Sequence, residues 1–214
     1  MKVGIVAYHK DAFRYPRSWL HQCMDSLKDN VINCSKLHLP VSFEFYELNY
    51  GEGGRAIGFS RDNYRHSPLK NYAAAMNYIY QWAFEECDVV ANVNVDDYYR
   101  DDRFSTLIAL LESGADIVSS NYCLIDESGD KIRRTDFAEL DIAAELARGN
   151  NIVSNPCHMM KRQVFDKLKF NPDLVPKEDL EYWRRCLAAG FTIKIAPECL
   201  HYYRIHPNQS GNIC

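Results

Sequence analysis

Hydrophobic and polar positions along the chain change from a strand-like to a helix-like period and back several times. The predicted strands cover residues 2–8, 41–48, 89–95, 115–125 and 191–196, and the predicted helices cover 16–28, 67–86, 102–112, 137–148 and 178–189. A hairpin turn is expected at 126–130, an extended segment at 151–160, and no regular structure at 199–214. This order predicts an α/β fold in the first half and a looser α+β arrangement in the second.

The bulk composition suits one globular domain that buries a sizeable core. The chain has 214 residues, of which 47% are hydrophobic and 25% are charged, with a formal net charge of −4. That charge, without any stripe of Lys and Arg, argues against a nucleic-acid-binding protein. No apolar run approaches the ~18 residues that span a bilayer, and residues 1–8 are too short for a signal peptide.

The eight cysteines are not spaced like a metal site or a disulfide framework. They stand at positions 23, 34, 87, 123, 157, 186, 199 and 214, and none forms a Cys-x-x-Cys pair. Several lie within apolar or helical stretches. We therefore expect reduced, mostly buried thiols, as is typical of a cytoplasmic protein.

Two adjacent carboxylates, Asp96 and Asp97, follow the apolar strand 89–95. In open α/β sheets, ligands bind beyond the carboxyl ends of the strands. Carboxylates at that place suit a hard divalent cation and, with it, a phosphate-bearing substrate. Asp is also common in turns and at helix N-caps, so this pair alone leaves function and local structure equally favoured.

A second group of polar residues lies about eighty positions later. Glu178 and Asp179 open a predicted helix beside Trp183. Acidic residues there are favoured by the helix dipole, but a carboxylate at an exposed helix start also suits a general base. The tail adds Arg204, whose guanidinium suits a diphosphate, and His206, for which a surface-loop histidine is the more common explanation.

In their order and spacing, these motifs resemble the inverting glycosyltransferases of family 2, which have the GT-A fold. The matching segments are 3–8, 94–97, 178–190 and 203–210. The resemblance implies a mostly parallel Rossmann-like sheet flanked by helices, with a smaller mixed half on the acceptor side. Residues 1–214 would form one domain, with 1–100 binding a nucleotide sugar and 101–214 the acceptor. Family members are often one domain of a longer polypeptide.

The resemblance also implies a role for each matching residue. Asp179 would be the catalytic base, and Asp97 with His206 would bind Mn²⁺ or Mg²⁺. The implied donor-binding residues are Tyr8, Asn49, Lys70, Asn77, Asp96, Asp97 and Arg204, and the implied acceptor-binding residues are Glu178 and Trp183. The donor would be a nucleoside diphosphate sugar, with a UDP-sugar favoured, and the acceptor a glycan, lipid or protein. The enzyme would be cytoplasmic or peripheral to a membrane.

Three departures from the family pattern leave the base and the sugar of the donor open. The first strand ends Ala7-Tyr8-His9, the second ends Glu47-Leu48-Asn49, and Asn94 stands at the first acid of an Asp-x-Asp motif. Two alternatives stay open: a nucleotidyltransferase, although residues 9–14 lack its usual glycines, and a sugar- or nucleotide-binding module without turnover. A purely structural domain would leave both acidic pairs unexplained.

Overall fold

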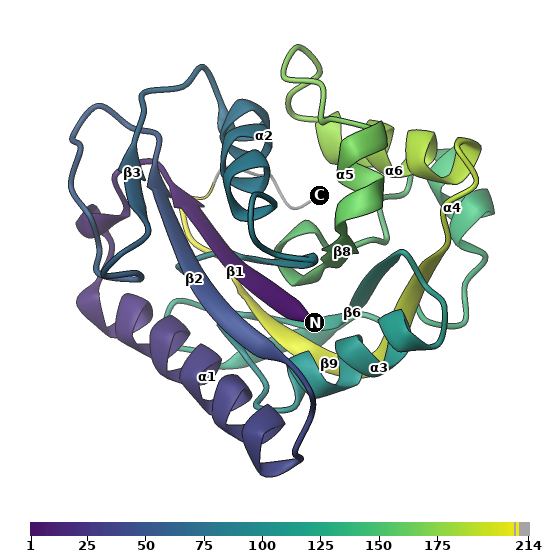
Figure 1. The fold of residues 1–214 in the computed structure, drawn as a ribbon, viewed down its shortest axis with the longest axis horizontal. Coiled ribbons are helices and arrows are strands. Elements are labelled where there is room, and N and C mark those ends of the chain that lie inside the picture. Colours follow the sequence, from purple (N-terminus) through teal and green to yellow (C-terminus); the bar gives the residue numbers. More distant parts are fainter. Residues whose placement is uncertain (208, 210–214) are drawn as a thin grey trace.

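The computed structural model describes residues 1–207 and 209, and within them nine strands form one curled sheet (Figure 1). The strands are β1 (Lys2–His9), β2 (Ser42–Asn49), β3 (Tyr64–His66), β4 (Val89–Val93), β5 (Tyr98–Tyr99), β6 (Ile117–Ile125), β7 (Lys131–Arg134), β8 (Met159–Lys161) and β9 (Ile193–Arg204). Their order is β3-β2-β1-β4-β8-β6-β9-β5, with β7 paired to β6. The pairs β1–β2, β1–β4, β2–β3 and β6–β9 are parallel.

Helices cover both faces of the sheet (Figure 1). They are α1 (Arg17–Lys36), α2 (Tyr72–Ala83), α3 (Arg103–Glu112), α4 (Ile142–Arg148), α5 (Arg162–Lys167) and α6 (Glu178–Ala188), with 3-10 turns η1 (Ala12–Arg14) and η2 (Asn155–Cys157). The helices α1 and α3 pack on one face, and α2, α5 and α6 pack on the other.

Strand β1 shows why the sheet is buried on both sides. Val3, Ile5 and Ala7 belong to the core beneath α1 and α3. Val6 and Tyr8 belong to the core beneath α2 and α6. Because successive side chains of a strand point to opposite faces, a nearly continuous apolar run is what a strand between two layers of helices requires.

The predicted elements are present, but several boundaries differ. Helix α1 continues to Lys36 instead of ending at Lys28. Helix α2 begins at Tyr72 because the side chain of Asn71 caps it, accepting a hydrogen bond from the Ala74 N–H. Helix α4 is shorter than predicted because Asp141 caps it. Gly114 and Gly190 follow α3 and α6 with φ of 101° and 89°, which explains why these helices stop there.

The prediction of an irregular tail was wrong for its first part. Strand β9 continues through Arg204, paired with β6 along its length and with β5 at Tyr202. Its pairing shifts register near Pro197, which interrupts the alternating pattern. Residues 208 and 210–214, including Ser210 of the proposed tail motif and Cys214, lie outside the described residues.

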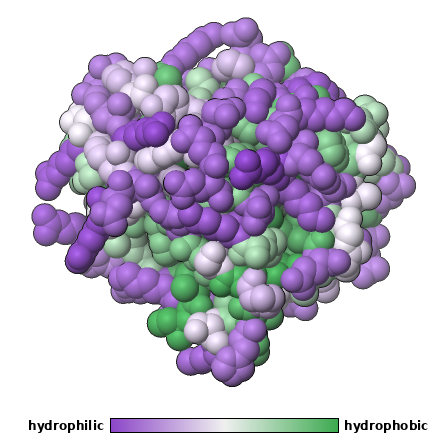
Figure 2. Space-filling view, viewed as in Figure 1, coloured by the Kyte–Doolittle hydropathy of each residue, from purple (hydrophilic) through white to green (hydrophobic). Residues whose placement is uncertain are grey.

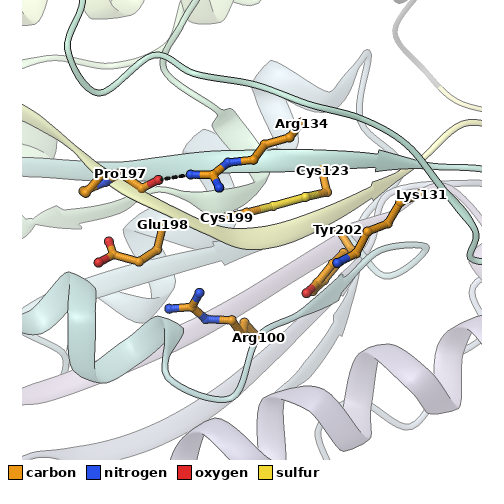
Figure 3. A pocket seen from close by; sticks show the side chains of 8 residues that line it. All are labelled: Arg100, Cys123, Lys131, Arg134, Pro197, Glu198, Cys199 and Tyr202. Atoms are coloured by element: carbon orange, nitrogen blue, oxygen red, sulfur yellow. Dashed lines mark hydrogen bonds between the residues drawn. A yellow bond between two sulfur atoms is a disulfide. The ribbon is translucent and has the colours of Figure 1, made fainter.

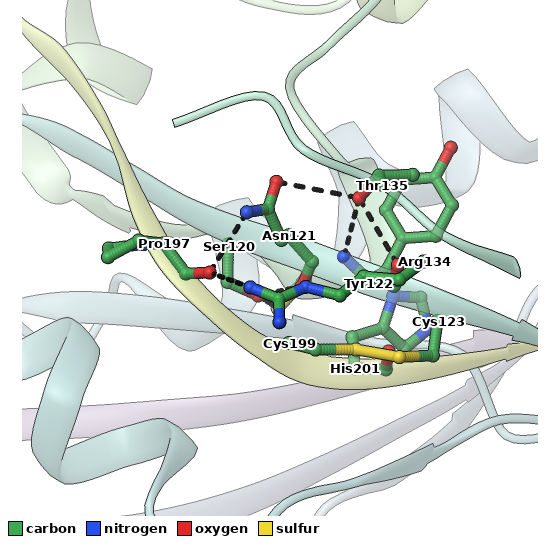
Figure 4. The surroundings of a disulfide bond; sticks show 10 residues. Ser120, Asn121, Tyr122, Cys123, Arg134, Thr135, Pro197, Cys199 and His201 are labelled. Carbon is green, nitrogen blue, oxygen red and sulfur yellow. Dashed lines mark hydrogen bonds between the residues drawn. A yellow bond between two sulfur atoms is a disulfide. The ribbon is translucent and has the colours of Figure 1, made fainter. Parts of the chain in front are cut away.

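The prediction that all cysteines are reduced was also wrong. A disulfide joins Cys123 of β6 to Cys199 of β9, with Cα atoms 6.1 Å apart (Figure 4). That separation lies within the usual range for disulfides. The free cysteines at 23, 34, 87, 157 and 186 are buried, as expected.

The surface seen in Figure 2 is largely hydrophilic, with hydrophobic residues gathered towards the lower end of the view. Helix α1 ends at that corner in Figure 1, and Ile32 and Leu37 are among the exposed hydrophobic residues. Within the described part of the chain, no helix has the length and apolar character needed to cross a bilayer.

Candidate functional site

The parallel strands β1, β2 and β4 bring their carboxyl ends to one edge of the sheet. Tyr8 lies at the end of β1, Asn49 ends β2, and Asp96 and Asp97 follow β4. This is the edge where open α/β sheets bind ligands. Strand β9, which is parallel to β6, brings Arg204 and His206 to the two carboxylates.

Asp97 is buried, and both of its oxygens have partners. The backbone N–H of Arg204 donates to Oδ1 at 2.7 Å, and Nε2 of His201 lies 2.8 Å from Oδ2. Burial, and then the charge of Asp96, raise the pKa of Asp97 well above its usual value. Burial lowers the pKa of His201 well below its usual value. These contacts tie β9 to the end of β4.

Asp96 is the more accessible of the two carboxylates, with 15% of its side chain exposed against 1% for Asp97. Its Oδ2 lies 2.9 Å from Nε2 of His206. The His206 ring packs against Tyr15 and Trp19, at centroid distances of 5.4 and 5.1 Å. A carboxylate oxygen of Asp96 and a ring nitrogen of His206 therefore lie side by side, and the rings of Tyr15 and Trp19 hold the imidazole in position.

This pair fits a divalent cation. Two neighbouring ligands of an octahedral ion with bonds of about 2.1 Å lie about 3 Å apart, close to the observed separation. Among residues 1–207 and 209, no group of three or more His, Cys, Asp or Glu side chains could hold a metal. A site built on Asp96 and His206 would thus need further ligands, such as phosphate oxygens and water. Asp97 as the metal ligand stays a prediction, and its hydrogen bonds favour Asp96 instead.

The guanidinium N–H groups of Arg204 donate hydrogen bonds to other residues of the chain. Its Nε donates to the Asp96 carbonyl, and its Nη1 donates to the carbonyls of Asp126 and Glu127. Its Nη2 donates to Oε1 of Gln22 at 2.6 Å. The buried guanidinium thereby fastens the β6–β7 turn and α1 to the carboxylates, and its predicted contact with a diphosphate stays untested.

Helix α6 presents the second acidic pair. Asp179 is partly exposed, and its Oδ2 accepts a hydrogen bond from Nδ2 of Asn151 at 2.8 Å. Burial raises the pKa of Asp179. Glu178 is fully buried, and within the described part of the chain neither of its oxygens has a hydrogen-bond partner. Burial, and then the charge of Asp179, raise the pKa of Glu178 to about 7.

The two acidic groups of the site lie within electrostatic reach of one tyrosine. Burial is the first reason that the pKa of Tyr203 is raised, and the charges of Asp97, Asp96 and Asp179 raise it further. The charges of both acidic groups therefore act on the same hydroxyl, that of Tyr203 on β9.

Tyr8 and Trp183 belong to the layer beneath this site. The Tyr8 hydroxyl accepts hydrogen bonds from the amides of Asn92 and Asn155, both at 3.4 Å. Trp183 is fully buried, and its ring lies edge-on to His158 at 5.1 Å. A ring with no exposed surface does not offer a stacking face in this conformation, so acceptor binding by Trp183 stays a prediction that no contact supports.

The remaining residues predicted to bind the sugar donor make contacts with other parts of the protein. Asn49 is buried and donates to Oδ1 of Asp11 at 3.0 Å. Lys70 is exposed and pairs with Asp173 at 2.7 Å. Asn77 exchanges two hydrogen bonds with the backbone of Phe170. These contacts hold loops and elements together, and a role in donor binding stays a prediction for all three.

Two residues that shape the edge were missed in the sequence. His201 was placed in an irregular tail, and only its position two residues before Tyr203 on one strand could have shown that it faces the site. Glu47 was noted only as a departure from the family pattern. It is buried beside His9 and accepts hydrogen bonds from the backbone of Ile57 and Phe59, both at 2.7 Å, which anchors the loop after β2.

Comparisons with known proteins agree with this arrangement. The family model described as glycosyl transferase family 2 matches residues 59–169, more than half of the chain. The "Uncharacterized glycosyltransferase MJ1057" of Methanocaldococcus jannaschii is 28% identical over 129 residues, which cover 57% of this chain and 43% of that protein. The chain thus spans less than half the length of this relative.

Solved structures of TarS from S. aureus share the fold. TarS 1–349 in complex with UDP-GlcNAc has a TM-score of 0.69 at 13% identity, covering 98% of this chain and 60% of that one. TarS 1–349 in complex with UDP has a TM-score of 0.65 at 14% identity, covering 97% and 61%. The architecture is GT-A-like, and the chain belongs to glycosyl transferase family 2.

Proposed function

We propose that this chain transfers a sugar from a nucleoside diphosphate sugar to an acceptor hydroxyl, with inversion at the anomeric carbon. The observation that carries the proposal is the placement of Asp96, paired with His206, just beyond the carboxyl end of β4, where open α/β sheets bind ligands. We assign this pair to a cation at the leaving diphosphate, and Asp179 at the start of α6 to the proton of the acceptor hydroxyl. Membership of the family supports the same reaction.

Asp96 and His206 would hold Mn²⁺ or Mg²⁺. The bound ion would supply positive charge that stabilises the leaving diphosphate. The chain itself keeps the two ligands in place: Arg204 bonds to the Asp96 carbonyl, while Tyr15 and Trp19 pack on the His206 ring. The oxygen ligand on Asp96 suits such hard cations.

Asp179 would accept the proton of the acceptor hydroxyl as that oxygen attacks the anomeric carbon. A carboxylate whose pKa is raised by burial is a better proton acceptor than an exposed one, and the hydrogen bond from Asn151 orients it. The bond from the sugar to the diphosphate breaks as the new glycosidic bond forms. Attack from the side opposite the leaving group inverts the configuration.

The donor is proposed to be a UDP-sugar, because TarS structures with this fold are complexes with UDP and with UDP-GlcNAc. The acceptor class, whether glycan, lipid or protein, is not specified by any contact described above.

Replacing the base tests this mechanism. We expect Asp179→Asn to reduce the release of UDP from UDP-sugars with acceptor by at least about 100-fold, while the Kd for the donor changes less than about threefold. The matched control is Asp166→Asn, an exposed Asp on α5, which should leave both quantities unchanged. An equal loss of donor binding and turnover would reject Asp179 as the base. Donor binding without turnover in the unmodified protein would favour a binding module.

A further inference from the structure

A pocket lies away from the candidate site, between β7 and the outer part of β9. It has a volume of about 470 Å³, and the Cys123–Cys199 disulfide forms part of its wall (Figure 3). Its other lining residues are Arg100, Lys131, Arg134, Pro197, Glu198 and Tyr202. Such a space is large enough for a sugar ring or a phosphate group.

The pocket shares no lining residue with the candidate site. On β9, His201 contacts Asp97, whereas its neighbour Tyr202 lines the pocket. On β6, the residue paired with His201 is Tyr122, and the residue paired with Tyr202 is Cys123 of the pocket wall. Because neighbouring residues of a strand point to opposite faces, His201 and Tyr202 point away from one another across β9.

The charge of the pocket is opposite in sign to that of the chain. Three cationic side chains, Arg100, Lys131 and Arg134, and one acid, Glu198, line the pocket in a protein with a formal net charge of −4. Arg100 is paired with Asp102, so Lys131 and Arg134 supply the positive charge for a ligand. Arg134 donates through Nη2 to the Pro197 carbonyl at 2.7 Å, which fixes its guanidinium and leaves other N–H groups for a ligand. A guanidinium held in this way suits a carboxylate or phosphate.

An aromatic ring completes the pocket. Tyr202 stacks on Tyr98 with centroids 4.4 Å apart and planes 13° from parallel, which holds the ring in place. Nζ of Lys131 lies 5.2 Å from the centre of the Tyr202 ring. A fixed ring beside cations offers an apolar face for a sugar and positive charge for an acidic substituent.

We propose that this pocket binds an anionic carbohydrate, with Lys131 and Arg134 pairing with its carboxylate or phosphate groups and Tyr202 contacting a sugar ring. Binding here requires neither a nucleotide nor transfer. Its failure would therefore leave the proposed glycosyl transfer unaffected, and the reverse also holds.

Calorimetric titration without nucleotide tests the proposal with three probes: hexagalacturonate, phosphorylated maltohexaose and unmodified maltohexaose. We expect at least one charged probe to bind and the neutral one not to bind, and the charged probe that binds identifies the acidic group. Binding should weaken as salt is raised from 0.05 to about 0.5 M. No binding by either charged probe, or equal binding by maltohexaose, would overturn the proposal.

Variants locate the binding. Lys131→Ala should weaken it about tenfold, whereas Lys36→Ala, at an exposed lysine of α1, should have no effect. Glu198→Gln removes the opposing charge and should tighten binding severalfold. Tyr202→Leu should weaken binding of the carbohydrate but leave turnover of a UDP-sugar unchanged. Binding that is indifferent to Lys131 and Glu198 would place the carbohydrate elsewhere and reject this pocket.

Discussion

At the scale of single residues, Glu178 is a buried acid whose side chain lacks a hydrogen-bond partner among the described residues. It stands at the start of α6. A buried polar group without a partner usually costs ~1–3 kcal/mol. Such costs are commonly retained where a side chain serves the function, and Glu178 stands next to the proposed base.

The first prediction concerns Glu178→Gln. Because the pKa of Glu178 is raised to about 7 in the folded protein, the fold binds its proton more tightly than the unfolded chain does. This contribution to stability is present below the unfolded pKa and is lost as the pH rises through about 7. Gln cannot ionise, so the variant should be more stable than the original protein at pH 8 by about 3 kcal/mol, with little difference at pH 4.

Urea unfolding at the two pH values measures this difference. The control is Glu181→Gln, because Glu181 is partly exposed and pairs with Arg185 on the same helix. Equal stability of Glu178→Gln and the original protein at pH 8 would show that Glu178 finds a partner when ionised.

A second residue-scale prediction concerns Asn151. Its side chain donates to Asp179 and lowers the pKa of that carboxyl, opposing the effect of burial. Asn151→Ala should therefore raise the pKa of Asp179, so that the acid limb of the pH–rate profile for transfer moves to higher pH. Activity should fall more at pH 6 than at pH 8. Asn150→Ala is the control, because Asn150 bonds to Glu145. A profile that moves equally in both variants would count against Asp179 as the base.

The sequence located the acidic pairs but could not distinguish their members. Asp96 and Asp97 are adjacent in a turn, where no alternating pattern shows which side chain is buried. The distinction comes from long-range partners, His201 and Arg204 for Asp97 and His206 for Asp96. These partners lie more than a hundred positions away, and all three stand in the segment 199–214, which was predicted to be irregular.

At the scale of elements, periodicity predicted the main strands and helices, and tertiary contacts set their ends. Strand β9 continues past the apolar segment because β6 and β5 pair with its aromatic part. The short strands β3 and β5 carry too few residues for a pattern to be read. Such elements depend on neighbours rather than on their own sequence.

The start of α2 gives an element-scale prediction. Oδ1 of Asn71 accepts from the Ala74 N–H, and its Nδ2 donates to the Pro172 carbonyl. Asn71→Ala should lower the free energy of unfolding by ~1–2 kcal/mol, measured by urea denaturation. Asn71→Asp keeps the cap but loses the bond to Pro172, so it should be less harmful. Unchanged stability in the Ala variant would mean that the cap contributes nothing.

At the scale of the whole molecule, one sheet connects the proposed donor and acceptor sides. Strand β4 ends at Asp96 and Asp97, and β8 joins it to β6 and so to β9. The TarS structures keep this architecture at 13–14% identity, so the fold is preserved while most side chains differ. Fold and family were therefore readable from a few ordered motifs, whereas the pocket beside β7 depends on residues that no motif singles out.

The most direct test of the account is a calorimetric titration of UDP-sugars with Mn²⁺ present and then with chelator. We expect one donor to bind with Mn²⁺ and to lose at least about tenfold in affinity with chelator, because the ion joins the diphosphate to Asp96 and His206. Asp96→Asn should lose the effect of Mn²⁺, whereas Asp101→Asn, at an exposed residue five positions later, should keep it. An affinity for the UDP-sugar that changes neither with chelator nor in Asp96→Asn would contradict the account. The absence of binding by any UDP-sugar would also contradict it.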